Sequence, residues 1–125
     1  MSARFRQRQR LRTRAEFDRV FRGGMRLDGA LFALVAAPNG GDEDRLGLVV
    51  GRRVGNAVER NRARRLVRDS FRRLQRPAPG LDIVILAKAG LGAQRQADVD
   101  HELRQRLARL ARAPRFGRPR AHPAP

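Results

Sequence analysis

Residues 56–76 constrain the fold most strongly, because their apolar and basic side chains separate onto opposite arcs of a helix. Asn56 is a favourable N-cap, Gly55 before it permits unusual backbone angles, and Pro77 cannot continue the helix. At about 100° per residue, one arc holds Ala63, Leu66, Val67, Ser70, Phe71 and Leu74. The opposite arc holds Asn61, Arg64, Arg65, Arg68 and Arg72. The segment therefore predicts a helix that packs on a sheet and presents arginine outwards.

The charge of this helix indicates a polyanionic partner. Ten arginines and two acidic residues lie between positions 52 and 76, a local net charge of +8, and the 125-residue chain carries +17. Such a field destabilises the compact state by self-repulsion, and such a surface binds phosphates by releasing counterions. Nucleic acid is the leading partner and an acidic membrane surface the second, while a merely solvated basic face is the alternative. The preference for arginine over lysine fits either bidentate phosphate recognition or a GC-rich genome.

Two further helices are predicted. Thr13 and Glu16 have the spacing of a capping box, so one helix begins near residue 13 and ends at Gly23-Gly24. The apolar periodicity of residues 98–112 predicts a last helix, with Asp98 as its N-cap.

Three apolar runs predict the strands of one sheet, at residues 30–37, 46–50 and 82–87. The loop between the first two is short, which favours an antiparallel hairpin. We therefore expect a small sheet packed with helices, in the α+β class.

The composition predicts a single domain with basic extensions. Residues 1–12 alternate arginine and glutamine and should form a flexible basic arm. Residues 13–112 should form one RNA-binding α/β domain, and the proline-containing residues 113–125 a disordered basic tail. No apolar run is long enough to cross a membrane and no secretory signal is expected, so we expect a cytoplasmic protein without membrane contact.

Self-contained catalysis is not expected from this sequence. There is no cysteine, which leaves no thiolate metal site, and the acidic run Asp42–Asp44 is more typical of a solvated turn than of a metal site. His101 and His122 lie far apart without a nucleophile or ligand spacing, and no phosphate-binding loop or dinucleotide motif is present. We therefore expect no catalytic residue and no metal bound by the protein alone.

The aromatic residues have two interpretations. Phe17, Phe21 and Phe32 are each more typical of a hydrophobic core. Taken together, on the first helix and the adjoining strand, their rings could instead form the floor of a groove in which unpaired bases stack on them. Phe71 lies on the apolar arc and should belong to the core.

The stretch GRRVGNAVERNRARRLVRDSF, residues 51–71, resembles the signature of the bacterial ribonuclease P protein subunit. In that signature a basic pair, a Gly-Asn-Ala-Val segment, an Arg-Asn-Arg core and further basic residues follow in this order. RLRTRAEFDRVFRGG resembles the N-terminal helix of the family, LFALVA and RLGLVV its paired strands, and DIVILAKAG its later strand. The resemblance covers roughly residues 10–110 and is far more specific than a basic patch.

The resemblance implies a two-layer α/β sandwich with a central mixed sheet and a left-handed βαβ crossover, against the usual right-handed default. It implies a subunit that binds a large catalytic RNA and the 5′ leader of precursor tRNA, with one protein per RNA. The ribonucleoprotein is an endonuclease that removes the leader to form the mature tRNA 5′ end. The RNA subunit would carry the chemistry and bind most of the required Mg²⁺.

The resemblance also assigns residues. The Arg-Asn-Arg core and its flanking basic positions would contact the catalytic RNA: Arg52, Arg53, Arg60, Asn61, Arg62, Arg64, Arg65 and Arg68. We expect the same contact from Arg72 on the arginine arc and from Asn56 at the start of the helix. Phe17, Phe21, Phe32 and Lys88 would form a cleft for the single-stranded leader. Some members carry a tyrosine where this chain has Val35, so the cleft would lack one stacking and hydroxyl contact.

Two other functions remain open at the level of the residues. A structural RNA-binding or ribosomal-type protein could use the same basic helix as a clamp, and an RNA chaperone could use it without a fixed partner. Cleavage of precursor tRNA by the matching catalytic RNA, with and without the protein, separates them from a ribonuclease P subunit.

Overall fold

The computed structural model describes residues 9–74 and 80–113, and within them it shows three α-helices and a four-stranded sheet. In chain order the elements are α1 (Arg14–Gly23), β1 (Met25–Asp28), β2 (Phe32–Pro38), β3 (Arg45–Val49), α2 (Ala57–Arg73), β4 (Leu81–Ala87) and α3 (Gln96–Arg112). Short 3-10 turns, η2 (Arg52–Val54) and η3 (Leu91–Ala93), precede α2 and α3. No helix in these two ranges has the length and apolar character that crossing a membrane requires.

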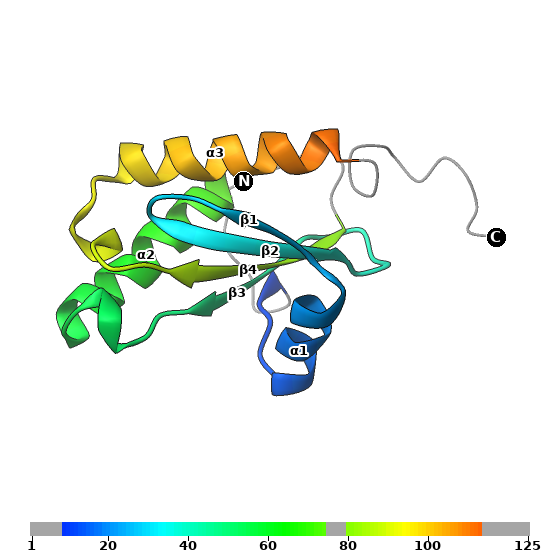
Figure 1. Cartoon of the computed structure of the whole chain (residues 1–125), viewed down its shortest axis with the longest axis horizontal. Helices are drawn as coiled ribbons and strands as arrows, with labels where there is room; N and C mark the ends of the chain where they lie inside the picture. Colours follow the sequence, from blue (N-terminus) through cyan, green and yellow to red (C-terminus); the bar gives the residue numbers. More distant parts are fainter. Residues whose placement is uncertain (1–8, 75–79, 114–125) are drawn as a thin grey trace.

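The sheet is mixed, with the strand order β1-β2-β4-β3 (Figure 1). β2 pairs antiparallel with both β1 and β4, while β3 pairs parallel with β4. The parallel pair is connected through α2, so β3, α2 and β4 form the predicted βαβ unit. The α+β class is confirmed, and the left-handed sense of the crossover stays a prediction from the resemblance.

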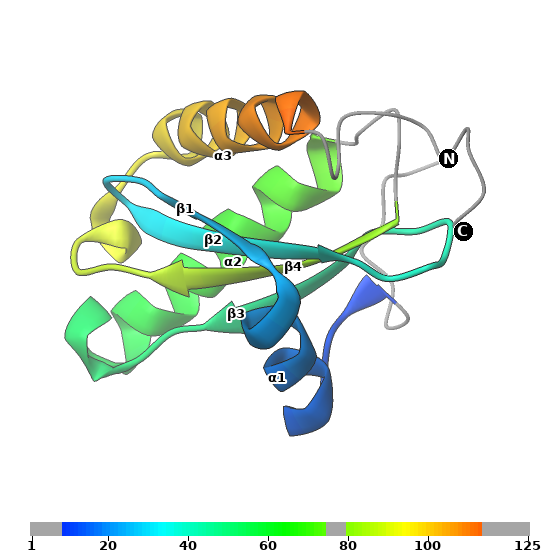
Figure 2. The same ribbon diagram turned by 45° about the vertical axis from the view of Figure 1, so that its right-hand side comes forward.

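Helices lie on both faces of the sheet (Figures 1 and 2). α2 and α3 cover one face, where alternate β2 residues such as Phe32 and Leu34 join the larger hydrophobic core. α1 covers part of the other face, where Val35 of β2 packs with Val20 of α1 and Val84 of β4 in a smaller cluster. Burial on both faces explains why β2 reads as a continuous apolar run without polar alternation.

The predicted local signals at the first two helix starts are confirmed. At α1, the Thr13 hydroxyl accepts the Glu16 N–H and the Glu16 carboxylate accepts the Thr13 N–H, which is a complete capping box. At α2, Asn56 and Glu59 form the same reciprocal pair. The predicted apolar arc of α2 is confirmed as well, since Ala63, Leu66, Val67, Ser70 and Phe71 are buried.

The predicted hairpin between residues 30–37 and 46–50 is wrong. β4 lies between β2 and β3, and it satisfies the backbone of both strands by pairing antiparallel with one and parallel with the other. β2 instead forms its hairpin with β1, a strand that was not predicted. β1 has four residues and buries just Leu27 among them, so its apolar signal is weak.

Two predicted boundaries also change. α3 begins at Gln96 with Arg95 at the N-cap position, so Asp98 lies in the first turn and is not the cap, although its carboxylate accepts the Arg95 N–H. The predicted flexible arm is wrong for its last residues, because the Leu11 N–H donates to the Leu46 carbonyl of β3 at 2.9 Å and Leu11 is buried. Residues 1–8 and 114–125 of the predicted arm and tail lie outside the described residues.

α2 and α3 are joined by a charged contact around Asp100. Arg73 of α2 donates two hydrogen bonds to its carboxylate, at 2.8 and 2.9 Å, and the Ser70 hydroxyl donates a third. The bonds from Arg73, the largest effect, hold the pKa of Asp100 below its usual 3.8, although burial acts in the opposite direction. The charged form of Asp100 therefore stabilises the packing of the two helices.

Asp100→Asn should lower the free energy of unfolding at neutral pH by about 2 kcal/mol, because the charge is lost and one acceptor oxygen is replaced by an NH2 group that cannot accept from Arg73. A carboxyl whose folded pKa is depressed contributes stability above its unfolded pKa and loses it as the pH falls through the folded value. Chemical denaturation from about pH 5 down to about pH 2 should therefore show a shallower acid loss in the variant than in the unmodified chain. Asp98→Asn, at a half-exposed position of the same helix, is the matched control; equal acid loss in the unmodified chain and Asp100→Asn would contradict this account.

Candidate nucleic-acid interface

The outward arc of α2 lines a groove of about 450 Å³. Its lining consists of Arg10, Asn61, Arg64, Arg65, Arg68, Asp69 and Arg72. The opposite arc of α2 packs on the sheet, so the helix holds these side chains at fixed spacing along one side. Guanidinium groups that converge on a concave surface suit a phosphate backbone, because each can bind phosphate oxygens through two parallel N–H donors.

The arginines of this groove are sparsely neutralised. Asp69 pairs with Arg72 at 3.2 Å, whereas neither the Arg65 nor the Arg68 side chain forms a hydrogen bond or ion pair within residues 9–74 and 80–113. Burial, and then the neighbouring charges of Arg10 and Arg64, lower the pKa of Arg68. The Arg68 guanidinium thus lies in a field that disfavours its charge, and an anion in the groove would relieve that repulsion.

The two asparagines have different roles in the structure. The amide oxygen of Asn56 accepts the Glu59 N–H at 2.9 Å and is therefore used as a helix cap. The amide oxygen of Asn61 accepts a hydrogen bond from Arg64 Nη1 at 3.0 Å, which orients that guanidinium beside the groove. Asn61 consequently belongs to the groove, whereas Asn56 acts first on the start of the helix.

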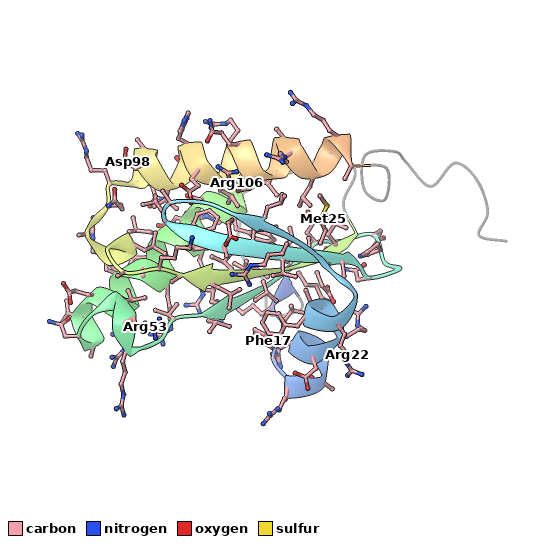
Figure 3. The ribbon with its side chains drawn as sticks, in the orientation of Figure 1. Phe17, Arg22, Met25, Arg53, Asp98 and Arg106 are labelled. Carbon is pink, nitrogen blue, oxygen red and sulfur yellow. The ribbon has the colours of Figure 1, made fainter. Side chains whose placement is uncertain are left out.

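The remaining predicted RNA-contact residues lie outside this groove. Arg52 and Arg53 are exposed on η2, and Figure 3 shows Arg53 near the start of α2. Arg60 donates to the Gly55 carbonyl at 3.1 Å, and Arg62 donates to the Gln94 carbonyl beyond η3 at 3.0 Å. The predicted set therefore divides into a groove along α2 and a second basic region around the N-terminal end of the helix.

A second hollow, of about 120 Å³, lies where α1, β3 and α2 meet. It is lined by Arg10, Leu11, Phe17, Leu46, Leu48, Arg64 and Arg68, and therefore shares three arginines with the groove. Figure 3 shows Phe17 where α1 meets the sheet. A Cβ placed on Gly47 would lie 2.7 Å from Phe17 Cζ, so the ring rests directly on the backbone of β3. An aromatic surface thus adjoins three basic groups.

The four predicted cleft residues do not share one surface. Phe17 lines the second hollow, and Phe21, one helical turn later on α1, is 43% exposed. Phe32 is 0% exposed and packs on the α2 and α3 side of the sheet, so its assignment to a base-stacking cleft is wrong. Val35, where some family members carry tyrosine, instead belongs to the cluster beneath α1 that Phe17 packs against.

Lys88 lies at the end of β4, beside the turn between β1 and β2. Its ammonium group donates to the Gly29 carbonyl at 2.6 Å and lies 3.8 Å from an Asp28 carboxylate oxygen. It lines neither hollow. For Lys88 to contact the leader as predicted, the leader must therefore run past this end of the sheet.

Arg10 is a site residue that the sequence did not indicate. An isolated parallel bridge joins it to Leu46, at the outer edge of β3, and this pairing places Arg10 in both hollows. The available signal was Leu11, an apolar residue among the arginines and glutamines of residues 6–12, which is buried in the cluster beneath α1. Among the described residues, no three His, Asp or Glu side chains gather where they could hold a metal ion.

Comparison with known proteins gives a consistent result. A family model described as Ribonuclease P matches residues 5–111. The Ribonuclease P protein component of Pseudomonas putida KT2440 is 42% identical over 115 residues, which cover 90% of this chain and 86% of the relative. The protein of the same name from Syntrophobacter fumaroxidans is 42% identical over 104 residues, covering 82% and 87%.

Solved structures share the fold. The RNase P protein from Thermotoga maritima superposes with a TM-score of 0.71 at 36% identity, covering 80% of this chain and 96% of that chain. The Staphylococcus aureus RNase P protein at 2.0 Å has a TM-score of 0.73 at 26% identity, covering 86% and 97%.

Arg68→Ala and Arg64→Ala should each weaken binding to a single-stranded RNA oligonucleotide and flatten its salt dependence. The slope of log K against log salt should fall by about 0.7 for each phosphate that the variant no longer neutralises. Titrations at several salt concentrations measure this slope. Arg14→Ala is the control, since that side chain is 93% exposed on α1 and outside the groove. A slope that changes equally in Arg14→Ala, or not at all in Arg68→Ala, would place the RNA elsewhere.

Proposed function

The chain belongs to the ribonuclease P protein family and is a subunit of that endoribonuclease, and we propose that it binds two RNA segments at adjoining sites. Its established partner class is the RNase P RNA. In our proposal, the groove along α2 binds phosphates of that RNA, and the hollow beside Phe17 receives the single-stranded 5′ leader of precursor tRNA. The protein then assists removal of the leader, which forms the mature tRNA 5′ end.

The observation that carries this proposal is the junction of the two hollows. Arg10, Arg64 and Arg68 line both of them, so a strand leaving the groove would meet Phe17 and Leu48 next. The residues that line the groove are arginines with one asparagine and one aspartate, and guanidinium donors of this kind suit a phosphate backbone. The smaller hollow adds an aromatic ring and leucine side chains to the same charges, a combination that suits unpaired nucleotides.

We place the hydrolytic chemistry and most of the Mg²⁺ on the RNA subunit. The described residues do not fit a magnesium site, since they bring no set of carboxylates together. The chain contributes in another way, because its net charge of +17 offsets the repulsion between RNA phosphates that Mg²⁺ otherwise screens. We infer one protein for each RNA, as the single α2 groove binds one RNA surface.

The protein should increase cleavage of precursor tRNA by its matching catalytic RNA at low Mg²⁺, and the gain should shrink as Mg²⁺ rises. The physical reason is that protein charge and Mg²⁺ neutralise the same phosphates. Single-turnover cleavage with and without the protein, over a Mg²⁺ series, measures the effect. No gain in cleavage or in substrate affinity at low Mg²⁺ would leave a structural RNA clamp as the better description.

Phe17→Leu provides the contrast within this experiment, because leucine keeps apolar packing on Gly47 and removes the aromatic face. Affinity for leader-bearing precursor should fall by about tenfold, within the range for losing one base stack, whereas affinity for mature tRNA should stay nearly the same. Equal losses for the two substrates would return Phe17 to a purely packing role.

A further inference from the structure

Asp82 is a carboxylate buried within the sheet, on the face that α1 covers. It lies on β4 and is 0% exposed. Arg45, its registered neighbour on β3, donates from Nε to Oδ1 and from Nη2 to Oδ2, both at 2.8 Å. Asn39 adds a hydrogen bond to Oδ1 at 3.0 Å, and Arg19 of α1 donates to Oδ2. A buried carboxylate is costly unless its oxygens are fully bonded, so these partners are held strongly in place.

The same cluster reaches the start of α1 through Arg45. Arg45 Nη1 donates to Glu16 Oε2 at 3.1 Å, while Glu16 Oε1 accepts the Arg12 and Thr13 N–H groups. The hydrogen bonds from these two backbone N–H groups are the largest of the effects that lower the pKa of Glu16. The hydrogen bond to Asp82 is the largest of the effects that raise the pKa of Arg45. Glu16 and Arg19 therefore tie α1 to the sheet by charge at two positions that flank Phe17.

Apolar packing alone gives α1 a small anchor. Val20 is its one buried residue, and Phe17 is partly buried beside it. The helix could therefore rotate or shift on the sheet at modest cost if the charged contacts were removed. Such a shift would move the Phe17 ring off Gly47 and change the hollow that it shares with Arg64 and Arg68.

We propose that Asp82, with Arg45 and Arg19, positions Phe17 and thereby sets how strongly the holoenzyme prefers precursor over mature tRNA. These three are positioning residues, since Asp82 is sealed from solvent and acts through α1. The inference rests on the proposed leader-binding role of the Phe17 hollow. It predicts that α1 can be loosened while the α2 arginines of the groove keep their places, because α2 packs on the opposite face of the sheet (Figure 2).

Arg19→Gln is the sharpest test, because Arg19 is 47% exposed and its loss leaves the Arg45–Asp82 pair intact. In the reconstituted holoenzyme, affinity for precursor tRNA should fall by about tenfold, as expected for a displaced base stack. Affinities for mature tRNA and for the catalytic RNA should stay within about twofold of the unmodified chain, as for independent sites. Arg19→Lys, which retains a charge near Asp82, should restore most of the precursor affinity.

A double-mutant cycle separates positioning from general stability. In a Phe17→Leu background, Arg19→Gln should cause almost no further loss, because both changes act on the same ring. Arg73→Gln is the matched control, since it breaks the comparable pair with Asp100 on the other face and should leave the substrate preference unchanged. Asp82→Asn should reproduce the Arg19→Gln effect more strongly, with folding checked by circular dichroism.

The outcomes are distinct. The positioning role alone would be overturned if the unmodified holoenzyme prefers precursor tRNA and Arg19→Gln keeps that preference in full. It would also be overturned if the loss of precursor affinity in Arg19→Gln adds to the loss in Phe17→Leu. Absence of any precursor preference in the unmodified holoenzyme would overturn the leader-binding function, and the positioning role with it.

Discussion

The burial of Asp82 is the constraint on which the arrangement of α1 depends. A carboxylate inside a sheet must find donors from the elements around it, and here they come from β3, from α1 and from the residue after β2. Together they fix where α1 lies on its face of the sheet, and that position sets the Phe17 ring on Gly47. The opposite face is held differently, by a continuous hydrophobic core beneath α2 and α3. One face of the sheet is thus held by packing, and the other by a smaller apolar cluster together with charged contacts.

The arginine arc of α2 links stability to function. Its groove gathers like charges, and the lowered pKa of Arg68 reflects burial first and then this crowding. Repulsion of this kind disfavours the compact state, whereas a bound polyanion removes it. Binding of RNA to the folded chain should therefore stabilise the fold by mass action as well as form the complex. The same side chains serve both effects, so substitutions in the groove change affinity and stability together.

Local signals in the sequence predicted local structure well. The Thr13–Glu16 capping box and the Asn56 N-cap are confirmed because residues within three positions decide them, and the apolar arc of α2 follows from helical geometry. The strand pairing was missed because β4, far along the chain, separates β2 from β3. Phe32 was misplaced because a strand buried on both faces hides which face each residue joins. The place of Arg10 depends on a bridge to β3; Leu11 beside it indicates a buried contact but not the strand that the segment joins.

The central claim is that adjoining hollows hold two different RNA segments, and site-directed crosslinking tests it most directly. The chain has no cysteine, so one cysteine can carry a short photoreactive group at a chosen position. Leu48→Cys places the group in the Phe17 hollow, and Asp69→Cys places it in the α2 groove without removing an arginine. In the holoenzyme bound to precursor tRNA, the first should label leader nucleotides and the second the catalytic RNA. Leader labelling from position 69 and none from position 48 would contradict the account.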